Sequence, residues 1–340
     1  MQPSRELIPR RRVGLTDLEI SELGLGCAAF GNLYRPVDAV TAQSALTAAW
    51  HGGVRYFDTA PYYGFGLSEL RIGEFFERLG TRDAVLSTKV GRSLEPVLAG
   101  AAPDHGFVDP LPFRPYFDYS RDAVLRQVEA SMQRLGTSHF GMLLVHDVGV
   151  RTHGDQHASV LRSVLRDTLP TLQQLKSEGL VDAVGIGCNE TDVCFELLAC
   201  ADLDVILLAG RYTLLEQRPS IDLLAACAER RISIVIGGPF NSGVLVDDDH
   251  YEYGSVPADV AAKVRRLRDV CRDHGIALAA AALQFPLAHP VVASVIPGAR
   301  SAEEIRSNIE HWATPISAAL WSDLRAAGLI DPDAPTAGSS

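Results

Sequence analysis

The chain has 340 residues, of which 47% are hydrophobic and 21% are charged, and its formal net charge is −11. This composition is typical of a globular protein with a sizeable core. The acidic balance argues against a nucleic acid or an anionic membrane as the partner. No apolar run is long enough to span a membrane, and the basic residues 1–12 are not followed by the apolar segment of a signal peptide. We therefore expect a cytoplasmic protein.

The six cysteines are scattered without a C-x-x-C pair, and the ten histidines show no metal-ligand spacing. In a chain of this size without a secretion signal, buried thiols stay reduced more often than they form disulfides or bind zinc. We expect free thiols and no metal site.

Short apolar runs alternate with helical patterns along the whole chain. A small hairpin is predicted first, over residues 11–20. The predicted strands are 23–28, 54–57, 84–90, 140–146, 181–187, 205–209, 232–237 and 291–297. The predicted helices are 38–51, 67–79, 120–135, 163–178, 191–201, 221–230, 257–274, 277–288, 301–312 and 316–327.

Eight strands, each followed by a helix, predict an α/β fold of the (β/α)8 TIM barrel type with an N-terminal β-hairpin and an extra C-terminal helix. A doubly wound open sheet is the competing interpretation, but no G-x-G-x-x-G motif opens a helix after an early strand. No linker divides the chain, so we expect one domain over residues 1–340 with an ordered core at about 12–328. Residues 91–117 are expected to form an insertion loop, residues 147–156 a polar loop, and residues 329–340 a disordered tail.

Polar residues stand at the ends of three neighbouring predicted strands. Asp58 follows the second strand, Lys89 lies in the third, and His146 ends the fourth, while Tyr63 lies in the loop after Asp58. Each residue alone has a structural explanation, such as capping a loop or lying at the rim. Because the carboxyl ends of barrel strands converge on one face, we expect the four side chains to meet there.

These four residue types suit proton transfer to or from an oxygen atom. A phenol with a pKa of about 10 is a poor acid or base at neutral pH, and an adjacent ammonium lowers that pKa. A carboxylate keeps the ammonium charged, and an imidazole orients the reacting oxygen. The carbon attached to this oxygen would exchange a hydride, which no side chain can carry, so a nicotinamide cofactor is required.

The sequence around these residues resembles the aldo-keto reductase superfamily. Asp58, Tyr63, Lys89 and His146 match its catalytic tetrad residue by residue. The resemblance extends over residues 12–309 through D-T-A-P-Y-Y-G-x-G-x-S-E, L-S-T-K-V-G-R, L-L-V-H-D, G-I-G-C-N-E and I-P-G-A-R-S-A-E-E-I-R-S-N-I. The segment A-G-R-Y-T-L-L-E-Q and the insertion resemble the group of L-fucose/D-threo-aldose 1-dehydrogenases and pyridoxal 4-dehydrogenases.

The resemblance implies an NAD(P)-dependent oxidoreductase that acts on a small molecule as a monomer or homodimer. We expect it to oxidise an aldose at C1 to the lactone, with Tyr63 as general acid/base and Asp58 paired with Lys89. The first alternative is oxidation of pyridoxal to its lactone. An alternative of another class is a regulatory subunit that binds the nicotinamide cofactor and turns over slowly.

The resemblance also implies where the cofactor binds. Asn189, with Cys188 as the weaker contact, would hold the nicotinamide amide, and Phe240 or Tyr212 would stack on the ring. Residues 239–243 would wrap the pyrophosphate. The expected cofactor contacts are Gly26, Asp58, Cys188, Asn189, Tyr212, Gly237, Pro239, Phe240, Asn241, Ser242, Gly243, Pro297, Gly298, Ala299, Arg300, Glu304 and Asn308.

Two positions at the adenosine end predict the choice of cofactor. Many NADP-dependent members have a lysine and an arginine where this chain has Gly298 and Glu304. A carboxylate repels a 2′-phosphate but accepts hydrogen bonds from ribose hydroxyls. We expect NAD to be preferred, with NADP possible because of Arg300. The expected substrate contacts are Phe30, Tyr34, Tyr62, Phe113 and Phe117.

Overall fold

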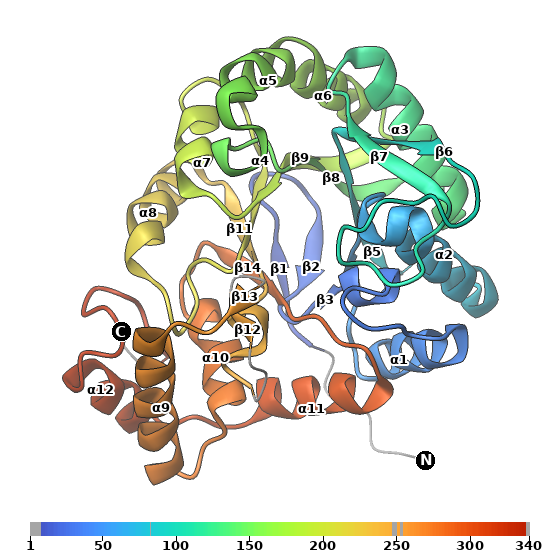
Figure 1. The fold of residues 1–340 in the computed structure, drawn as a ribbon. Coiled ribbons are helices and arrows are strands. Elements are labelled where there is room, and N and C mark those ends of the chain that lie inside the picture. Colours follow the sequence, from blue (N-terminus) through green and yellow to red (C-terminus); the bar gives the residue numbers. More distant parts are fainter. Residues whose placement is uncertain (1–7, 82, 247–249, 252–253, 338–340) are drawn as a thin grey trace.

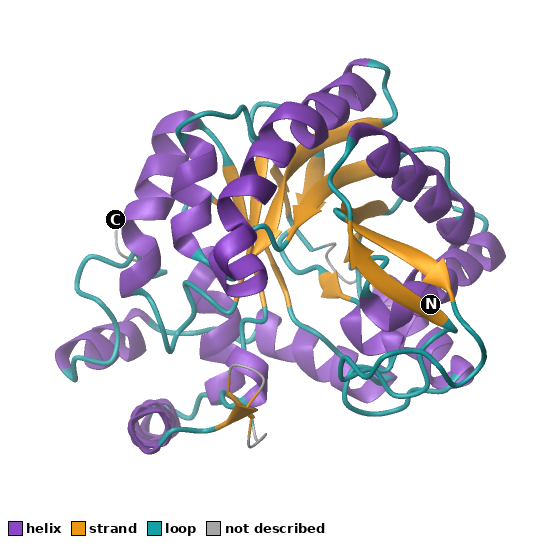
Figure 2. Cartoon of the chain, turned by 45° about the horizontal axis from the view of Figure 1, so that its top comes forward, coloured by secondary structure: helices purple, strands orange, loops and turns teal. Residues whose placement is uncertain are grey.

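The structure is a computed structural model that describes residues 8–81, 83–246, 250–251 and 254–337. Eight parallel strands form one sheet surrounded by helices (Figures 1 and 2). Their order around the sheet is β14-β11-β10-β9-β8-β5-β4-β3. Isolated parallel bridges from Leu23 to Val295 and from Gly26 to Gly298 join its two edges. The predicted (β/α)8 barrel is therefore confirmed.

The barrel strands agree closely with the apolar runs of the sequence. They are β3 (Leu25–Gly26), β4 (Tyr56–Asp58), β5 (Val85–Val90), β8 (Phe140–His146), β9 (Val181–Cys188), β10 (Val205–Ala209), β11 (Ser233–Gly237) and β14 (Val292–Ile296). Parallel strands buried on both faces are expected to form such continuous apolar runs.

Helices cover the outside of the barrel (Figure 2). They are α1 (Ala39–His51), α2 (Leu67–Leu79), α3 (Arg121–Leu135), α4 (Val150–His153), α5 (His157–Ser163), α6 (Leu169–Ser177), α7 (Thr191–Leu198), α8 (Ile221–Arg230), α9 (Ala258–Asp273), α10 (Leu278–Leu287), α11 (Ala302–Ala313) and α12 (Ala318–Ala326). The extra C-terminal helix is thus α12, which packs against α9. None of the helices within the described ranges is long and apolar enough to cross a membrane.

The predicted N-terminal hairpin is also present and seals one end of the barrel. Its strands are β1 (Arg10–Arg12) and β2 (Glu19–Ser21). Val13 and Ile20 are fully buried in a cluster with the inward-facing side chains of the barrel. The amide of Gly14 donates to Oγ of Ser233 at the start of β11. The hairpin thus covers the amino ends of the strands, and the carboxyl ends lie at the opposite mouth.

The insertion after β5 is more regular than the loop that we expected. Its strands β6 (Arg92–Pro96) and β7 (Phe113–Phe117) pair as an antiparallel hairpin. The proline and glycine content that predicted a loop belongs mostly to the connection between these strands. The insertion therefore places both ends of the hairpin at fixed positions beside the barrel.

Two other expectations were wrong. The polar loop predicted over residues 147–156 contains α4 and a 3-10 turn (Gly154–Gln156). The next helix begins at His157 instead of Ser163, and it continues through a π-helical turn (Val164–Thr168) into α6. The tail is not disordered over residues 329–337, because Leu329, Ile330 and Ala334 are buried. In the tail, these apolar side chains find buried positions that a polar local sequence does not reveal.

A buried carboxylate ties α2 to the barrel and to α3. Glu69 of α2 is fully buried and accepts hydrogen bonds from Oγ1 of Thr88 and from Nε of Arg134, each at 2.6 Å. Breaking a buried pair by removing one partner is costly because it leaves an uncompensated charge. The glutamate that ends the D-T-A-P-Y-Y-G-x-G-x-S-E motif therefore has a structural role.

We predict that Glu69→Ala lowers the free energy of unfolding by about 3–5 kcal/mol, since Arg134 is left without its buried partner. The measurement is urea unfolding followed by circular dichroism. Glu74→Ala is the matched control, because Glu74 forms an exposed pair with Arg78 on the same helix and should cost about 0–1 kcal/mol. Equal losses in the two variants would contradict the assignment.

Candidate active site

Three side chains at the carboxyl ends of neighbouring strands meet at one mouth of the barrel. Asp58 ends β4, Lys89 lies one residue before the end of β5, and His146 ends β8. Nζ of Lys89 donates to Oδ2 of Asp58 at 2.7 Å and lies 3.2 Å from Oη of Tyr63. The Lys89 and Asp58 side chains are only 2% and 3% exposed. The expected ion pair and its contact with a phenol are therefore present.

The turn that carries Tyr63 is held by the close approach of two glycines. Gly64 has a φ of +63°, and a Cβ there would lie 2.5 Å from the carbonyl oxygen of Gly31. A Cβ on Gly31 would in turn lie 2.4 Å from the carbonyl carbon of Tyr63. The next residue, Phe65, is fully buried with a φ of +56°, a conformation that costs about 1 kcal/mol or more. The surrounding packing thus imposes the turn and fixes the phenol.

His146 stands beside this phenol. Its ring is perpendicular to that of Tyr63, with the ring centroids 6.0 Å apart. The side chain is 8% exposed, and Nδ1 is buried without a hydrogen-bond partner among the described residues. Nε2 lies 3.4 Å from Oδ2 of Asp147, so it is the ring nitrogen that has a polar neighbour. Oη of Tyr119 donates to the backbone carbonyl of His146 at 3.0 Å, which holds the end of β8 in place.

Burial dominates the titration of the phenol and the imidazole. It raises the pKa of Tyr63 to about 12, although the Lys89 ammonium acts in the opposite direction. It lowers the pKa of His146 to about 3, although the Asp147 carboxylate opposes this shift. Burial would also lower the pKa of Lys89, but the Asp58 charge prevails and raises it above its usual value. The expected lowering of the phenol pKa by Lys89 is thus outweighed by desolvation.

A cavity of about 750 Å³ opens beside these side chains. Asp58 and Tyr63 are among its lining residues, and its wall extends past the ends of several strands to α11. Most of the residues expected to contact the cofactor line it. They are Gly26, Asp58, Asn189, Gly237, Pro239, Phe240, Asn241, Ser242, Gly243, Gly298, Ala299, Arg300, Glu304 and Asn308.

Three expected cofactor contacts do not line the cavity. Tyr212 has a φ of +52° and is fully buried, with its ring 5.5 Å from that of Phe285, so it cannot stack on a nicotinamide there. Sγ of Cys188 lies 3.4 Å from Sγ of Cys194 in the core. Pro297 is buried, and its carbonyl accepts a hydrogen bond from the amide of Gly26. Of the two aromatic residues considered for stacking, only Phe240 reaches the cavity.

The expected substrate contacts divide in the same way. Tyr34 lines the cavity, and the ring centroid of Tyr62 lies 6.1 Å from that of His146. Phe30 is wrong as a substrate contact, because it is fully buried in the core. Phe113 and Phe117 lie in β7, outside the lining of the cavity. The ring of Phe117 packs against Tyr119 and His153 and lies 4.7 Å from the guanidinium carbon of Arg92.

Sequence reasoning missed a charged pair next to His146. Nη2 of Arg92 donates to Oδ2 of Asp147 at 2.6 Å. Both residues belong to motifs noted above, K-V-G-R and L-L-V-H-D, but neither motif indicates that they meet. Sequence reasoning also missed four charged residues that line the cavity, namely Arg35, Arg151, Arg211 and Glu303.

The cavity fits a nicotinamide dinucleotide in the chemistry of its walls. Oδ1 of Asn241 and Nε of Arg300 are buried without a hydrogen-bond partner among the described residues. Asn241 and Ser242 are both in the left-handed conformation, so the loop after β11 turns sharply beside the cavity. A Cβ on Gly298 would meet only the carbonyl oxygen of Gly26, at 3.9 Å, which leaves room there. Unpaired polar atoms and a cation along an open cleft suit a molecule with phosphates and ribose hydroxyls.

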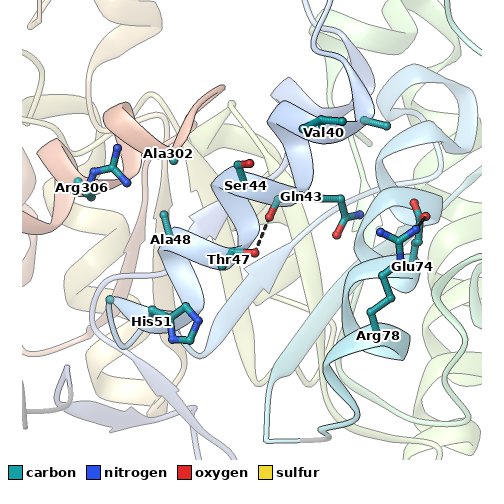
Figure 3. Close-up of a pocket in the computed structure, with 12 residues that line it drawn as sticks. Val40, Gln43, Ser44, Thr47, Ala48, His51, Glu74, Arg78, Ala302 and Arg306 are labelled. Atoms are coloured by element: carbon teal, nitrogen blue, oxygen red, sulfur yellow. Dashed lines mark hydrogen bonds and ion pairs between the residues drawn. The ribbon is translucent and has the colours of Figure 1, made fainter. Parts of the chain in front are cut away.

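A wider depression of about 1110 Å³ lies on the outer surface between α1, α2 and α11 (Figure 3). Its lining includes Val40, Thr47 and Arg306, and none of the strand-end residues described above. Oγ1 of Thr47 donates to the carbonyl of Gln43 within α1. The groups that suit proton transfer therefore belong to the barrel mouth and not to this larger depression.

The comparisons with known proteins agree with this site. The sequence model of the Aldo/keto reductase family matches residues 22–328. The chain is 40% identical over 335 residues to a pyridoxal 4-dehydrogenase of Microbacterium luteolum, covering 94% of this chain and 98% of the relative. It is 38% identical over 322 residues to a D-threo-aldose 1-dehydrogenase of a Pseudomonas species, covering 92% and 95%.

Solved structures show the same likeness. An aldo-keto reductase from Bacillus halodurans in its holo form superposes with a TM-score of 0.75 at 26% sequence identity. The match covers 95% of this chain and 97% of that one. Both the sequence and the arrangement of the barrel are thus similar to those of known oxidoreductases.

The buried imidazole predicts a specific loss of stability in acid. The pKa of His146 is about 3 in the folded protein, against about 6.5 for an unfolded histidine. Below pH 6.5 the unfolded chain binds a proton that the folded protein does not, so stability falls as the pH is lowered towards 3. Between pH 7 and pH 4 the wild-type protein should lose about 3 kcal/mol more than His146→Gln. Urea unfolding at each pH measures this difference.

The matched control for this experiment is His139→Gln, because His139 is exposed and paired with Asp182. This variant should follow the wild-type curve. If His146→Gln followed it as well, the depressed pKa of His146 would be wrong.

Proposed function

The chain belongs to the aldo/keto reductase family and is an oxidoreductase acting on CH–OH groups, and we propose that it oxidises a cyclic hemiacetal to a lactone. The observation that carries this proposal is the buried contact of Asp58, Lys89 and Tyr63 beside a cavity large enough for cofactor and substrate. Proton transfer at a hydroxyl, coupled to hydride loss from its carbon, is the chemistry that this arrangement supports.

The cofactor in this proposal is NAD. Asn189 would hold the amide of the nicotinamide, Phe240 would lie against its ring, and residues 239–243 would follow the pyrophosphate. Residues 298–300 and the first turns of α11 would hold the adenosine end. When bound, the nicotinamide accepts the hydride from the hemiacetal carbon.

The residues of the mouth would bind the reacting hydroxyl and transfer its proton. His146, through Nε2, donates a hydrogen bond to the reacting oxygen and orients it. Oη of Tyr63, as the phenolate, accepts the proton of the hydroxyl and becomes the phenol, and the ammonium of Lys89 at 3.2 Å stabilises the phenolate before this transfer. Asp58 keeps Lys89 charged and oriented. Burial excludes water from the contact and strengthens each of these interactions.

An aldose oxidised at C1 is the first substrate class that we propose. Several polar side chains line the cavity, among them Tyr34, Arg35 and Arg151. Hydroxyl and guanidinium groups donate hydrogen bonds to the several neutral hydroxyls of a sugar. The resemblance to the D-threo-aldose 1-dehydrogenase supports the same class.

Pyridoxal is the second candidate, supported by a different observation. Tyr62 lies within 5.3 Å of Phe107 and 5.8 Å of His105 between ring centroids, and the guanidinium of Arg92 lies 3.9 Å from the Tyr62 ring. His105 and Phe107 belong to the connection between β6 and β7, and Arg92 belongs to β6. An aromatic wall with a cation beside it suits a flat pyridine ring. The pyridoxal 4-dehydrogenase relative supports this class.

Parallel assays distinguish the two substrates. L-fucose, D-arabinose and pyridoxal are offered with NAD and with NADP, and the reduced cofactor is followed by its absorbance. A kcat/KM for an aldose at least about tenfold above that for pyridoxal supports the first class, and the reverse ratio supports the second. Negligible rates with all three compounds would remove the proposal of hemiacetal oxidation.

We predict that Tyr63→Phe lowers kcat about 100- to 10,000-fold, since it removes the proton acceptor without changing the packing of the ring. In the wild-type protein the oxidation rate should rise with pH on the alkaline side, because the pKa of Tyr63 is raised to about 12 and the base is its phenolate. Steady-state kinetics from pH 7 to 10 test both expectations.

Tyr116→Phe is the matched control for Tyr63→Phe, because Tyr116 is exposed on β7. It should keep the wild-type rate and the wild-type pH profile. Near-normal turnover in Tyr63→Phe would show that another group transfers the proton.

The preference for NAD rests on the start of α11. Oε2 of Glu304 accepts a hydrogen bond from the amide of Arg300 at 2.7 Å, and Oγ of Ser301 accepts one from the amide of Glu304. The Glu304 carboxylate is therefore held in place at the wall of the cavity, which Glu303 also lines. Two carboxylates beside one arginine disfavour an additional phosphate at this end.

We predict that Glu304→Arg raises the ratio of kcat/KM for NADP to that for NAD about tenfold or more, since repulsion is replaced by attraction. Glu304→Gln removes the negative charge but keeps the capping of the helix, because the side-chain oxygen of a glutamine at this position can still accept a hydrogen bond from a backbone amide at the start of α11. It should give a smaller increase in the ratio at unchanged thermal stability. No change in the ratio in either variant would assign cofactor choice to other residues.

A further inference from the structure

The turn after β8 holds a charged pair that has no part in the proton transfer described above. Oδ2 of Asp147 lies 2.6 Å from Nη2 of Arg92 and 3.4 Å from Nε2 of His146. A single carboxylate oxygen is therefore shared between a guanidinium and the imidazole. We propose that Arg92 and Asp147 are positioning residues that hold His146 in the tautomer with its proton on Nε2. The catalytic consequence rests on the proposed function, in which this proton faces the reacting oxygen.

The backbone of Asp147 is arranged to turn its side chain back towards His146. Asp147 has a φ of +49°, an uncommon conformation for a residue other than glycine, and its amide donates to the carbonyl of Gly187 at 2.9 Å. Its own carbonyl lies 3.0 Å from Nε2 of His153. Strained backbone that the surrounding contacts impose is often found at functional sites.

Arg92 is held just as firmly. Its guanidinium carbon lies 3.9 Å from the centroid of the Tyr62 ring and 4.7 Å from that of Phe117, and its side chain is 12% exposed. A planar guanidinium stacks on aromatic rings and at the same time donates to a carboxylate, which an ammonium cannot reproduce. Because Arg92 is the first residue of β6, the hairpin β6–β7 is anchored to the mouth through this side chain.

The chemistry of the imidazole explains why a carboxylate is useful here. A neutral imidazole carries one N–H, and the nitrogen that carries it depends on its surroundings. Nδ1 of His146 is buried without a partner among the described residues, whereas Nε2 faces Asp147. The negative charge favours the proton on Nε2, but 3.4 Å is too long for a strong hydrogen bond. The proton thus stays available to a substrate oxygen, while the 2.6 Å contact with Arg92 holds the carboxylate in place beside the ring.

The kinetic test uses Asp147→Asn and Arg92→Met in the full-length protein. Both variants should lower kcat about 100-fold, since a misplaced catalytic group costs about this much. KM should stay within about threefold in Asp147→Asn, whereas Arg92→Met also alters the wall around Tyr62 and is therefore judged by kcat alone. Arg92→Lys should recover part of the loss by restoring the charge without the stacking. A wild-type kcat in Asp147→Asn would overturn the proposal.

The chain offers a close match for this pair at the other end of β4. The guanidinium carbon of Arg55 lies 3.7 Å from the Trp50 ring centroid, and its Nε lies 3.3 Å from Oδ2 of Asp83. Arg55→Met and Asp83→Asn therefore remove an equivalent stacked pair away from the mouth. Both should keep the wild-type kcat, and a 100-fold loss in either would attribute the effect to general destabilisation and so count against the proposal.

A second measurement does not depend on any substrate. Nitrogen NMR of protein labelled at histidine reports the tautomer of each ring, and the signals of His146 are assigned by their loss in His146→Gln. At pH 7 the wild-type ring should be neutral with its proton on Nε2, and Asp147→Asn and Arg92→Met should shift this tautomer while Arg55→Met does not. A proton on Nδ1 in the wild type, or no shift in either variant, would overturn the proposal. If no hemiacetal is oxidised, the proposed function fails, and the tautomer alone decides this inference.

Discussion

The buried ion pair between Asp58 and Lys89 is the interaction on which the site depends. Removing two charges from water is costly unless every donor and acceptor is paired. Nζ of Lys89 contacts Oδ2 of Asp58, the carbonyl of Thr59 and Oη of Tyr63, which satisfies its three N–H groups. Oδ1 of Asp58 accepts from Oγ of Ser87. Strands β4 and β5 and the turn after β4 are thus tied together through one ammonium.

This pairing also decides the charge state of the mouth. The carboxylate keeps the lysine charged, and the charge of Lys89 then opposes the rise in the pKa of Tyr63 that burial causes. A neutral phenol, a neutral imidazole and an ammonium meet with little exposure to solvent. Proton exchange at the phenol is therefore controlled by one nearby cation. Small displacements of Lys89 would change the free energy of deprotonating Tyr63.

The hairpin inserted after β5 connects the substrate side to the same centre. Arg92 stacks between Tyr62 and Phe117 while it pairs with Asp147, the residue after His146. The insertion therefore does more than cover the barrel. Its first residue pairs with the residue that follows His146, and its connecting segment supplies two aromatic contacts of Tyr62.

The sequence by itself determined the barrel, because the periodicity of apolar residues and the turn residues are local signals. It also placed Asp58, Lys89 and His146 at one mouth, because the carboxyl ends of parallel barrel strands lie on one face. Only the tertiary structure decided where the remaining side chains point. Tyr212 and Phe30 lie in segments beside the site but turn into the core, since direction depends on backbone angles and packing that composition does not encode. Arg92 and Asp147 are 55 residues apart in the chain. They meet because each lies two residues beyond a paired position, Val90 of β5 and Val145 of β8, and this strand pairing is decided by the tertiary structure.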